Sequence, residues 1–242
     1  MSDKTKIEVV DATWNPVRGC TRISPGCANC YAKRFAERFR GVKGHPYEQG
    51  FDLRLVPAKL DDPLRWRKPR RVLVNSMSDL FHEAIADEYI GRVLNVMKRS
   101  ARHTFQVLTK RPKRMRALLR GPLAYGGTLN HVWWGVSVEN RSHGLPRMKF
   151  LRDTPAKIRF LVLEPLLEGL GRLNLDGIHW IVVGAESGPG ARPLKLDWVR
   201  AVRDQALAAG VPLFFKQQVV NRRKVSLPLL DGRQWTQVPE TS

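Results

Sequence analysis

Short apolar runs recur along the chain and predict buried β-strands. Each run is bounded by polar, glycine or proline residues, and several are followed by a segment with helical spacing. Such runs, in which apolar residues do not alternate with polar ones, are typical of strands covered on both faces of a parallel sheet. The alternation of strand and helix signals therefore predicts βαβ units. The runs lie at residues 72–74, 105–108, 132–136, 158–163, 180–183 and 213–215.

The first sixty residues follow a less regular pattern. Residues 7–10 predict a small strand, and residues 13–17 predict an extended segment that leads into a cysteine-containing loop. Aromatic residues recur at every fourth position from Tyr31, which predicts a helix over 31–40 with this stripe in the core. Residues 41–63 contain glycine, proline and aromatic residues without a period, and they predict a long loop.

Three later helices have recognisable start signals. Asp87 is placed to cap a helix with a regular apolar face, and Pro112 suits the first turn of another. Asp197 precedes a third helical pattern that stops near Gly210. Each of these helices follows a predicted strand, as a parallel sheet with crossover helices requires.

These elements predict an α/β fold with about six or seven parallel strands. We expect a single-domain partial or complete (β/α) barrel over residues 1–220, with residues 221–242 forming a covering hairpin or tail. The length of 242 residues suits one such domain. An open doubly wound sheet is the alternative arrangement of the same βα units.

All three cysteines lie in one short loop, as Cys20, Cys27 and Cys30 with the spacing C-x6-C-x2-C. An odd number of cysteines in a chain of this length does not suit a disulfide framework, so the pattern favours metal or cluster ligation. Structural zinc would need a fourth ligand, such as His45 or His82. A four-iron cluster held by three thiolates would leave one iron open. Packed cysteines without a metal are the remaining alternative.

The chain is strongly basic, with 42 lysines and arginines against 22 acidic residues and a net charge of +20. Nine of the basic residues lie between Lys98 and Arg120, where there is no carboxylate, and further clusters lie at 65–71 and 222–224. Such clusters predict a polyanionic partner, and nucleic acid fits better than a membrane surface. No apolar segment approaches the ~20 residues of a bilayer span, and no signal-like segment opens the chain, so we expect a cytoplasmic protein.

Polar residues follow every predicted strand. In a parallel barrel the carboxyl ends of the strands meet at one face, which is where active sites form, and the cysteine loop would open onto the same face. Taken singly, each residue also has a structural explanation, such as a helix cap or an ordinary surface position. The glycine-rich segment 184–193 matches neither a P-loop nor a dinucleotide-binding fingerprint, but it can let a backbone approach a ligand, with Glu186 available for ribose hydroxyls or an amino group.

Seven segments of the chain, taken together, resemble the phage-associated three-cysteine-motif family, which is itself similar to a divergent branch of the radical S-adenosylmethionine (radical SAM) enzymes. The resemblance covers nearly the whole chain. The cysteine spacing departs from the C-x3-C-x2-C that is usual in radical SAM enzymes. The segments are residues 11–16, 20–31, 75–82, 108–112, 135–140, 163–167 and 184–193.

This resemblance implies a 4Fe-4S cluster on Cys20, Cys27 and Cys30, with S-adenosylmethionine bound at the open iron. Reductive cleavage of that cofactor would give a 5′-deoxyadenosyl radical, which abstracts hydrogen from the substrate. By position, the resemblance also implies a set of cofactor contacts. These are Ser76, Ser78 and Asp79 near the amino group, Ser137, Glu139 and Asn140 near the ribose and carboxylate, and Tyr31 beside the adenine.

The leading hypothesis is therefore a radical SAM-like iron-sulfur enzyme that modifies or repairs nucleic acid. Lys110, Glu164 and Lys216 are the candidate catalytic residues, and Lys110, Arg111 and Lys216 are also expected to meet phosphates, with Lys113, Arg114 and Arg116 extending that surface.

Two alternatives come from other classes of protein. One is a zinc- or cluster-stabilised nucleic-acid-binding protein without catalysis, which supports a protein partner encoded nearby. The other is a metal-dependent hydrolase whose ligands would be Asp79, His82, Glu139, Glu164 and Glu186.

Overall fold

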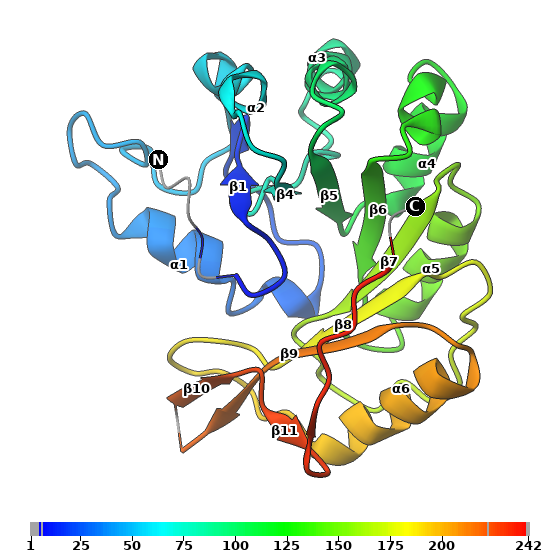
Figure 1. Ribbon diagram of the computed structural model, residues 1–242. Coiled ribbons are helices and arrows are strands. Elements are labelled where there is room, and N and C mark those ends of the chain that lie inside the picture. Colours follow the sequence, from blue (N-terminus) through cyan, green and yellow to red (C-terminus); the bar gives the residue numbers. More distant parts are fainter. Residues whose placement is uncertain (1–4, 6, 222, 241–242) are drawn as a thin grey trace.

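The computed structural model describes residues 5, 7–221 and 223–240, and its central feature is a curled sheet that forms a half-barrel (Figure 1). Within the described residues the sheet has eight strands in the order β1-β4-β5-β6-β7-β8-β9-β10. The first seven pair in parallel, as the alternating pattern predicted, and β10 pairs with β9 antiparallel. The strands are β1 (Ala12–Trp14), β4 (Arg71–Val74), β5 (Thr104–Thr109), β6 (Val132–Ser137), β7 (Ile158–Leu163), β8 (Trp180–Gly184), β9 (Leu213–Val220) and β10 (Arg223–Ser226).

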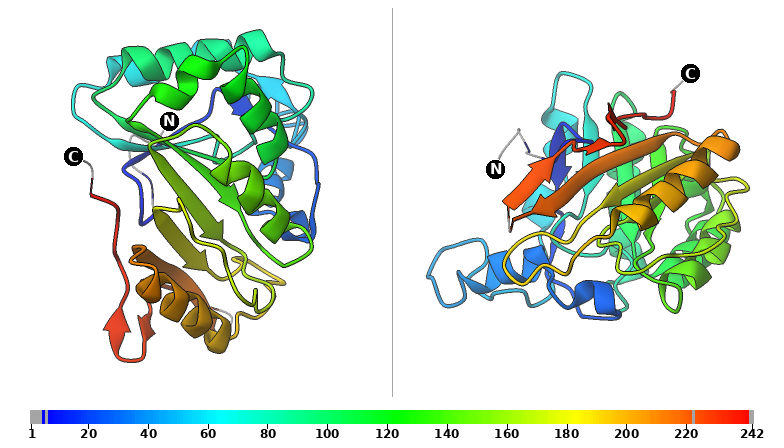
Figure 2. Two further views of the ribbon diagram at one scale, coloured as in Figure 1. Left: turned by 90° about the vertical axis from the view of Figure 1, so that its right-hand side faces the viewer. Right: turned by 90° about the horizontal axis from the view of Figure 1, so that it is seen from below.

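Helices cover the outer side of this sheet, and the two views of Figure 2 show how the sheet curves away from them. Only α1 (Tyr31–Glu37) lies apart from the others, at the open side of the half-barrel (Figure 1). The outer helices are α2 (Asp62–Arg65), α3 (Asp87–Arg99), α4 (Pro112–Arg120), α5 (Gly144–Arg152) and α6 (Leu196–Ala208). Short 3₁₀ turns are η1 (Pro25–Cys27), η2 (Pro57–Lys59) and η3 (Ala124–Thr128).

The two faces of the sheet have separate apolar cores, because successive residues of a strand point to opposite sides. Trp134 lies in the large core under the outer helices, and its neighbour Trp133 lies in a smaller cluster on the inner face. This inner cluster also contains Phe160, Trp180 and Phe214. Both faces of β6 and β8 are buried, which explains why their sequences read as continuous apolar runs.

A glycine in β6 makes room for this inner cluster. A Cβ at Gly135 would lie 2.4 Å from the Phe160 ring, so any side chain there would displace the aromatic residue that closes the inner face. Glycine in a strand is unfavourable on its own, and close packing against a neighbour is a common reason for it.

The beginning of the chain differs from the prediction. Residues 7–10, expected as a strand, form a turn in which Val10 N donates to Ile7 O at 3.2 Å. Val9 and Val10 are nevertheless buried in the inner cluster. Tertiary packing against the sheet, rather than strand pairing, therefore explains their apolar character. The first strand of the sheet is β1, which pairs with β4.

The segment 41–63 is more ordered than the long loop that was predicted. It contains β3 (Arg54–Leu55), η2 and the start of α2. β3 pairs antiparallel with β2 (Val17–Arg18), which directly precedes the cysteine loop. Pairs of two residues carry too little periodicity to be found from sequence.

The aromatic stripe on the first helix was predicted to lie in the core, and this was wrong. The helix ends at Glu37, and Tyr31 and Phe35 are 50% and 44% exposed. Phe35 packs edge-on against Phe39 and Tyr47 instead, in a local aromatic group. Helical spacing shows which residues share a face, but not whether another element covers that face.

The helix starts also need correction in detail. Ala86, not Asp87, occupies the N-cap of α3, and Asp87 accepts a hydrogen bond from Arg114 at 2.5 Å from within the first turn. Pro112 begins α4 as predicted, and α6 begins at Leu196.

The end of the chain returns to the sheet. β10 extends it, β11 (Leu229–Leu230) and β12 (Arg233–Gln234) form a small hairpin, and Thr236 pairs with Phe214 of β9. Trp180 Nε1 donates to the backbone oxygen of Gln237 at 2.8 Å, which ties this last segment to the inner face. No helix in the described part of the chain is long and apolar enough to cross a membrane.

Candidate functional site

Strand alternation brings an acid and a lysine together on the inner face of the sheet. Glu164 directly follows β7 and lies four residues after Phe160, so its side chain is on the side of the inner cluster. Lys216 is related to Phe214 of β9 in the same way. Lys216 Nζ lies 2.8 Å from both carboxylate oxygens of Glu164, in a pair whose side chains are 14% and 21% exposed.

A register shift in β9 strengthens this arrangement. Val183 pairs with Phe215, but Gly184 pairs with Gln217, so Lys216 is the extra residue of a bulge. Gln217 Nε2 can then also donate to Glu164 Oε1, at 3.2 Å. Bulges next to functional sites commonly re-aim a side chain in this way.

Lys110 and Ser137 form a second contact at the carboxyl ends of neighbouring strands. Lys110 follows β5 and Ser137 ends β6, and Lys110 Nζ donates to Ser137 Oγ at 3.1 Å. Ser137 is 1% exposed, whereas Lys110 is partly exposed. The lysine therefore has an anchored position, and no carboxylate of the described residues is hydrogen-bonded to its Nζ.

Backbone conformation places the cysteine loop on these strand ends. Gly19 has a φ of 77°, and a Cβ there would lie 2.1 Å from the backbone oxygen of Asp52, so only glycine fits. Gly19 N donates to Met77 O at 3.0 Å, and Cys20 N donates to Phe51 O at 3.3 Å. The loop is thus fixed between the segment after β4 and the start of the β3 segment.

The serines predicted to contact a cofactor also fix this loop. Ser76 Oγ donates to Asn15 Oδ1 at 3.2 Å, and Ser78 Oγ donates to Val17 O at 2.8 Å. Tyr31 donates to the backbone oxygen of Ser76 at 2.6 Å. Although the Tyr31 ring is half exposed, burial of its hydroxyl end, together with the nearby charge of Glu164, raises the pKa of Tyr31.

Arg111 connects the first cysteine to the sheet. Its Nη1 donates to Cys20 Sγ at 3.4 Å and to Asp79 Oδ2 at 3.2 Å, and its Nη2 donates to Thr21 Oγ1 at 2.9 Å. Burial disfavours the charge of Arg111, but Asp79 and Glu83 more than compensate, and its pKa is raised. Arg111 was expected to meet phosphates, and in the structure it is buried and engaged with protein partners.

Asp79 uses its carboxylate for the protein as well. Its Oδ1 accepts from Thr109 Oγ1 at 2.7 Å and from Phe81 N at 3.0 Å, and its Oδ2 accepts from Lys110 N at 3.0 Å. With the contact from Arg111, each carboxylate oxygen of Asp79 accepts two hydrogen bonds, which is close to its full capacity. Asp79 therefore organises the ends of β4 and β5.

The electrostatic surroundings of Cys20 favour its protonated form in the chain alone. Burial and, to a lesser extent, the charge of Asp79 raise the pKa of Cys20 to about 11, although Arg111 acts in the opposite direction. His82 lies nearby, with its Nε2 2.9 Å from Thr21 Oγ1. Burial and the charge of Arg111 lower the pKa of His82.

A second arginine, Arg147, pairs with a carboxylate that contacts the cysteine loop. Arg147 Nη1 donates to Glu139 Oε2 at 2.5 Å, and the Glu139 side chain is fully buried. Burial opposes ionisation of Glu139, but Arg147 outweighs it and holds the pKa of Glu139 below its ordinary value. A Cβ at Gly26 of the cysteine loop would lie 3.1 Å from the Glu139 side chain, so the two are in contact.

Glu186 ties the other side of the loop to β8. Arg192 donates to it through Nη2 at 2.5 Å, and Asn29 Nδ2 donates to its Oε2 at 2.8 Å. Arg192 Nη2 also donates to the backbone oxygen of Pro25 at 3.0 Å. Burial opposes ionisation of Glu186, yet Arg192 and Asn29 lower its pKa.

The structure thus brings most of the predicted residues to one edge of the sheet, around the cysteine loop. Asn140 is the exception. Its Oδ1 accepts from His143 N at 2.9 Å in the turn before α5, and it has no contact with the loop among the described interactions. The carboxylates proposed for a metal-dependent hydrolase lie in separate pairs with different partners: Asp79 with Arg111, Glu139 with Arg147, Glu164 with Lys216 and Glu186 with Arg192.

The three cysteines fit a cluster in their chemistry. All are free thiols with partial exposure, and Cys20 and Cys30 pack against the same small apolar group around Ala36. The charge of Cys27 also acts on Cys20, so these two thiols are near each other. Among the described residues, no three Cys, His, Asp or Glu side chains are grouped closely enough to hold a single metal ion. A four-iron cluster takes each thiolate at a different iron, so its ligands need not converge on one point.

Sequence reasoning missed the structural role of the arginines. Arg111, Arg147 and Arg192 each pair with a buried carboxylate that follows a different strand. The sequence did contain a signal for this role. A buried acid needs a cationic partner, and each of these arginines lies between the end of one strand and the start of the next. The number of basic residues alone suggested a polyanionic partner. Part of that positive charge is paired with carboxylates inside the protein.

Comparisons with known proteins give a family but no described relative. Neither the curated proteins nor the solved structures contain a match to this chain. One family model matches residues 4–239, and its description is "Protein of unknown function (DUF5131)". Since this match spans nearly the whole sequence, the chain belongs to the DUF5131 family of proteins of unknown function.

Proposed function

We propose that this protein is a radical SAM-like iron-sulfur enzyme that modifies or repairs nucleic acid. The observation that carries the proposal is the position of the three free thiols. Their loop contacts the residues that follow β4, β5, β6 and β8 of a curled parallel sheet. In parallel barrels and half-barrels this edge is where catalytic groups gather.

Cys20, Cys27 and Cys30 would hold a 4Fe-4S cluster with one open iron for S-adenosylmethionine. Once reduced by an external electron donor, such a cluster would supply the electron for cleavage of this cofactor to methionine and a 5′-deoxyadenosyl radical. The protein contributes a hydrogen bond from Arg111 to Cys20 Sγ, and hydrogen bonds to ligand sulfur tune the potential of such clusters.

The polar residues around the loop divide into two groups in this proposal. Ser78, Asp79 and Glu139 use their polar atoms within the protein, so we assign them to positioning the loop and the strand ends. Tyr31 and Ser137 retain capacity for a ligand, because a hydroxyl can both donate and accept. The cofactor contacts implied by the resemblance to the phage-associated three-cysteine family remain part of the proposal for these residues.

Glu164 and Lys216 are the proposed substrate-directed pair. They are held together at the inner face by a bulge, are partly exposed, and lie close enough to Tyr31 for Glu164 to influence its pKa. A proton held at Lys216 Nζ can be delivered to a reacting group, with Glu164 stabilising the charged form. Lys110 extends the same edge.

Nucleic acid is the proposed substrate because of the charge of the chain, +20 in total. A polyanion is attracted to such a surface over long range. The proposal also places the enzyme in the cytoplasm, where thiolates stay reduced and nucleic acid is present.

The experiment that tests the chemistry is an assay for 5′-deoxyadenosine after anaerobic reconstitution with iron and sulfide, with dithionite and S-adenosylmethionine added. We expect the product from the native chain and none from Cys20→Ala, Cys27→Ala or Cys30→Ala. Arg22→Ala is the matched control, because Arg22 lies exposed in the same loop and has no described partner. Stoichiometric zinc without cofactor cleavage would instead support a zinc-stabilised nucleic-acid-binding protein.

A further inference from the structure

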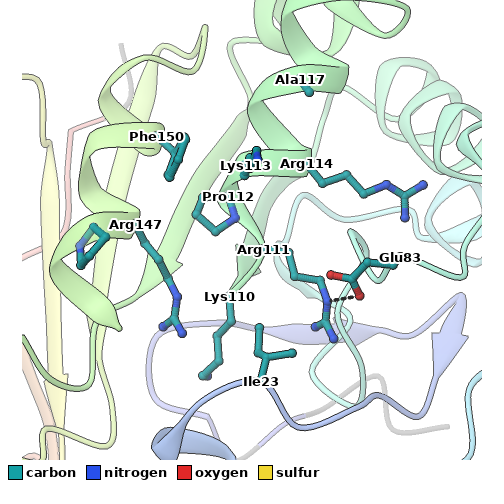
Figure 3. A pocket seen from close by; sticks show the side chains of 11 residues that line it. Ile23, Glu83, Lys110, Arg111, Pro112, Lys113, Arg114, Ala117, Arg147 and Phe150 are labelled. Carbon is teal, nitrogen blue, oxygen red and sulfur yellow. Dashed lines mark hydrogen bonds and ion pairs between the residues drawn. The ribbon is translucent and has the colours of Figure 1, made fainter. Parts of the chain in front are cut away.

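A cavity of about 560 Å³ opens between α4, α5 and the cysteine loop (Figure 3). Ile23 of the cysteine loop forms one side, and Phe150 of α5 lies across from it. Pro112 and Ala117 of α4 and Pro146 of α5 complete the apolar part of the lining. The volume lies in the range of pockets that hold a small organic ligand.

The charged part of the lining is almost entirely positive. Five cations and one carboxylate, Glu83, line the cavity, and Glu83 is paired with Arg111. The cations are Lys110, Arg111, Lys113, Arg114 and Arg147.

Two of these cations remain available for an anion. Arg111, Arg114 and Arg147 are each engaged with a carboxylate of the protein. Lys110 Nζ has only the neutral Ser137 hydroxyl as its described hydrogen-bond partner, and Lys113 has no hydrogen bond or ion pair with the described residues. In Figure 3, Lys113 lies toward the upper end of the cavity and Lys110 toward the lower end.

The apolar part of the lining suits a flat ring. The guanidinium of Arg116 lies over one face of the Phe150 ring, 4.9 Å from its centre, so a base would use the opposite face. Ile23 is 38% exposed, although it lies on a strongly charged surface. Stacking of a base on an aromatic side chain, with lysines at the phosphates, is how many proteins bind single-stranded nucleic acid.

We propose that this cavity takes one nucleotide of a single-stranded nucleic acid. The base would lie between Phe150 and Ile23, and the flanking phosphates would meet Lys110 and Lys113. A base paired in a duplex cannot enter without leaving the stack, so single strands should bind better than duplexes.

The cavity also lies next to the proposed reaction site. Arg111 lines the cavity and donates to Cys20 Sγ, so a base held against Ile23 of the cysteine loop would be one side chain away from Cys20. This inference deepens the proposed function. The link between the bound base and the radical chemistry rests on that function. The binding itself needs neither cluster nor cofactor.

The test uses fluorescence anisotropy with labelled oligothymidylate, and with an abasic strand of the same length that keeps the phosphates. For the native chain we expect about tenfold tighter binding of the base-bearing strand. Ala117→Trp should remove this preference, because Ala117 is exposed and a large side chain there fills the cavity. Ala201→Trp, at an exposed position of α6, should retain it.

A second variant protects the test against misfolding of the first. Ile23→Asp removes an exposed apolar wall in a loop and adds a negative charge, and it should also remove the preference for the base-bearing strand. Lys113→Gln should reduce the slope of log affinity against log salt by about one, whereas Lys149→Gln, at an exposed position of α5 that does not line the cavity, should leave the slope unchanged. Oligouridylate and a duplex, measured in parallel, identify RNA, DNA or duplex preference.

Equal affinity of the native chain for base-bearing and abasic strands would overturn the proposal. So would an unchanged base preference in folded Ala117→Trp and Ile23→Asp. All measurements are made in air without reductant or S-adenosylmethionine. A failure of the radical chemistry would therefore leave these results unaffected, and a failure of base binding would leave the cofactor-cleavage assay unaffected.

Discussion

The inner face of the half-barrel has two different ends. Near the amino ends of the strands, Trp133, Phe160, Trp180 and Phe214 fill it with aromatic rings. Near the carboxyl ends of the same strands, the inner face carries polar groups, of which the Glu164–Lys216 pair is the clearest. The two ends share strands, twist and side-chain alternation, so geometry does not explain the difference.

The difference is explained by what each end contributes. Burial of aromatic side chains stabilises the fold, whereas partly buried ion pairs give little net stability because desolvation opposes their attraction. We therefore assign the polar end, with its charged pairs, to the proposed activity. This comparison makes the two ends separable by experiment: one should control stability and the other activity.

The largest expected effect on stability is at the aromatic end. Trp180→Ala should lower the free energy of unfolding by about 3–5 kcal/mol, because Trp180 is fully buried and its Nε1 holds the backbone of Gln237. Urea unfolding measures this. At a temperature where the variant stays folded, its rate of 5′-deoxyadenosine formation should be close to that of the native chain. A loss of activity in the folded variant would contradict the separation.

The next largest effect on stability is expected at the Glu139–Arg147 pair, which is charged like the polar end but buried like the aromatic end. Arg147→Met leaves Glu139 buried without its partner and should cost about 3 kcal/mol at neutral pH. The folded pKa of Glu139 is lowered in the native chain, so the pair stabilises above the ordinary carboxyl pKa, and this contribution is lost as pH falls through the folded pKa.

The difference between native chain and Arg147→Met should therefore shrink as the pH is lowered, because the unpaired Glu139 can then be neutral. Glu139→Gln combined with Arg147→Met should recover part of the loss at neutral pH. Unfolding in urea at several pH values measures both. A difference that grows toward acid pH would show that the pair does not act as described.

The smallest effect on stability, with the largest on activity, is expected at Lys216. Lys216→Met should lower the free energy of unfolding by only about 1 kcal/mol, because its pair with Glu164 is partly exposed. Substrate modification should fall by at least about a hundredfold, the range usual for a lost acid or base. Lys149→Met, at an exposed lysine of α5, is the control for the loss of one charge.

The fold was largely predictable, because buried strands in a parallel sheet leave a strong apolar signal. The runs that begin at residues 72, 132 and 158 correspond to β4, β6 and β7. The short elements were not predictable. β2 and β3 have two residues each, and their pairing depends on contacts that are distant in sequence.

The candidate site was predictable in its position but not in its internal partners. Polar residues after each strand were expected to gather at one edge of the sheet, and most of them do, since alternation and parallel pairing place them there. Which arginine pairs with which acid depends on side-chain packing across different strands, as for Arg192 and Glu186 around the cysteine loop. The exposure of Phe35 was missed for a similar reason, because no sequence pattern shows how much of this face of α1 other elements cover.

The most direct test of the central claim is the metal content of the chain after anaerobic purification and reconstitution. We predict about four irons and about four sulfides per chain, and neither in a variant with Cys20, Cys27 and Cys30 all replaced by alanine. One zinc per chain, with no iron retained after reconstitution, would contradict the assignment of these thiols to an iron-sulfur cluster.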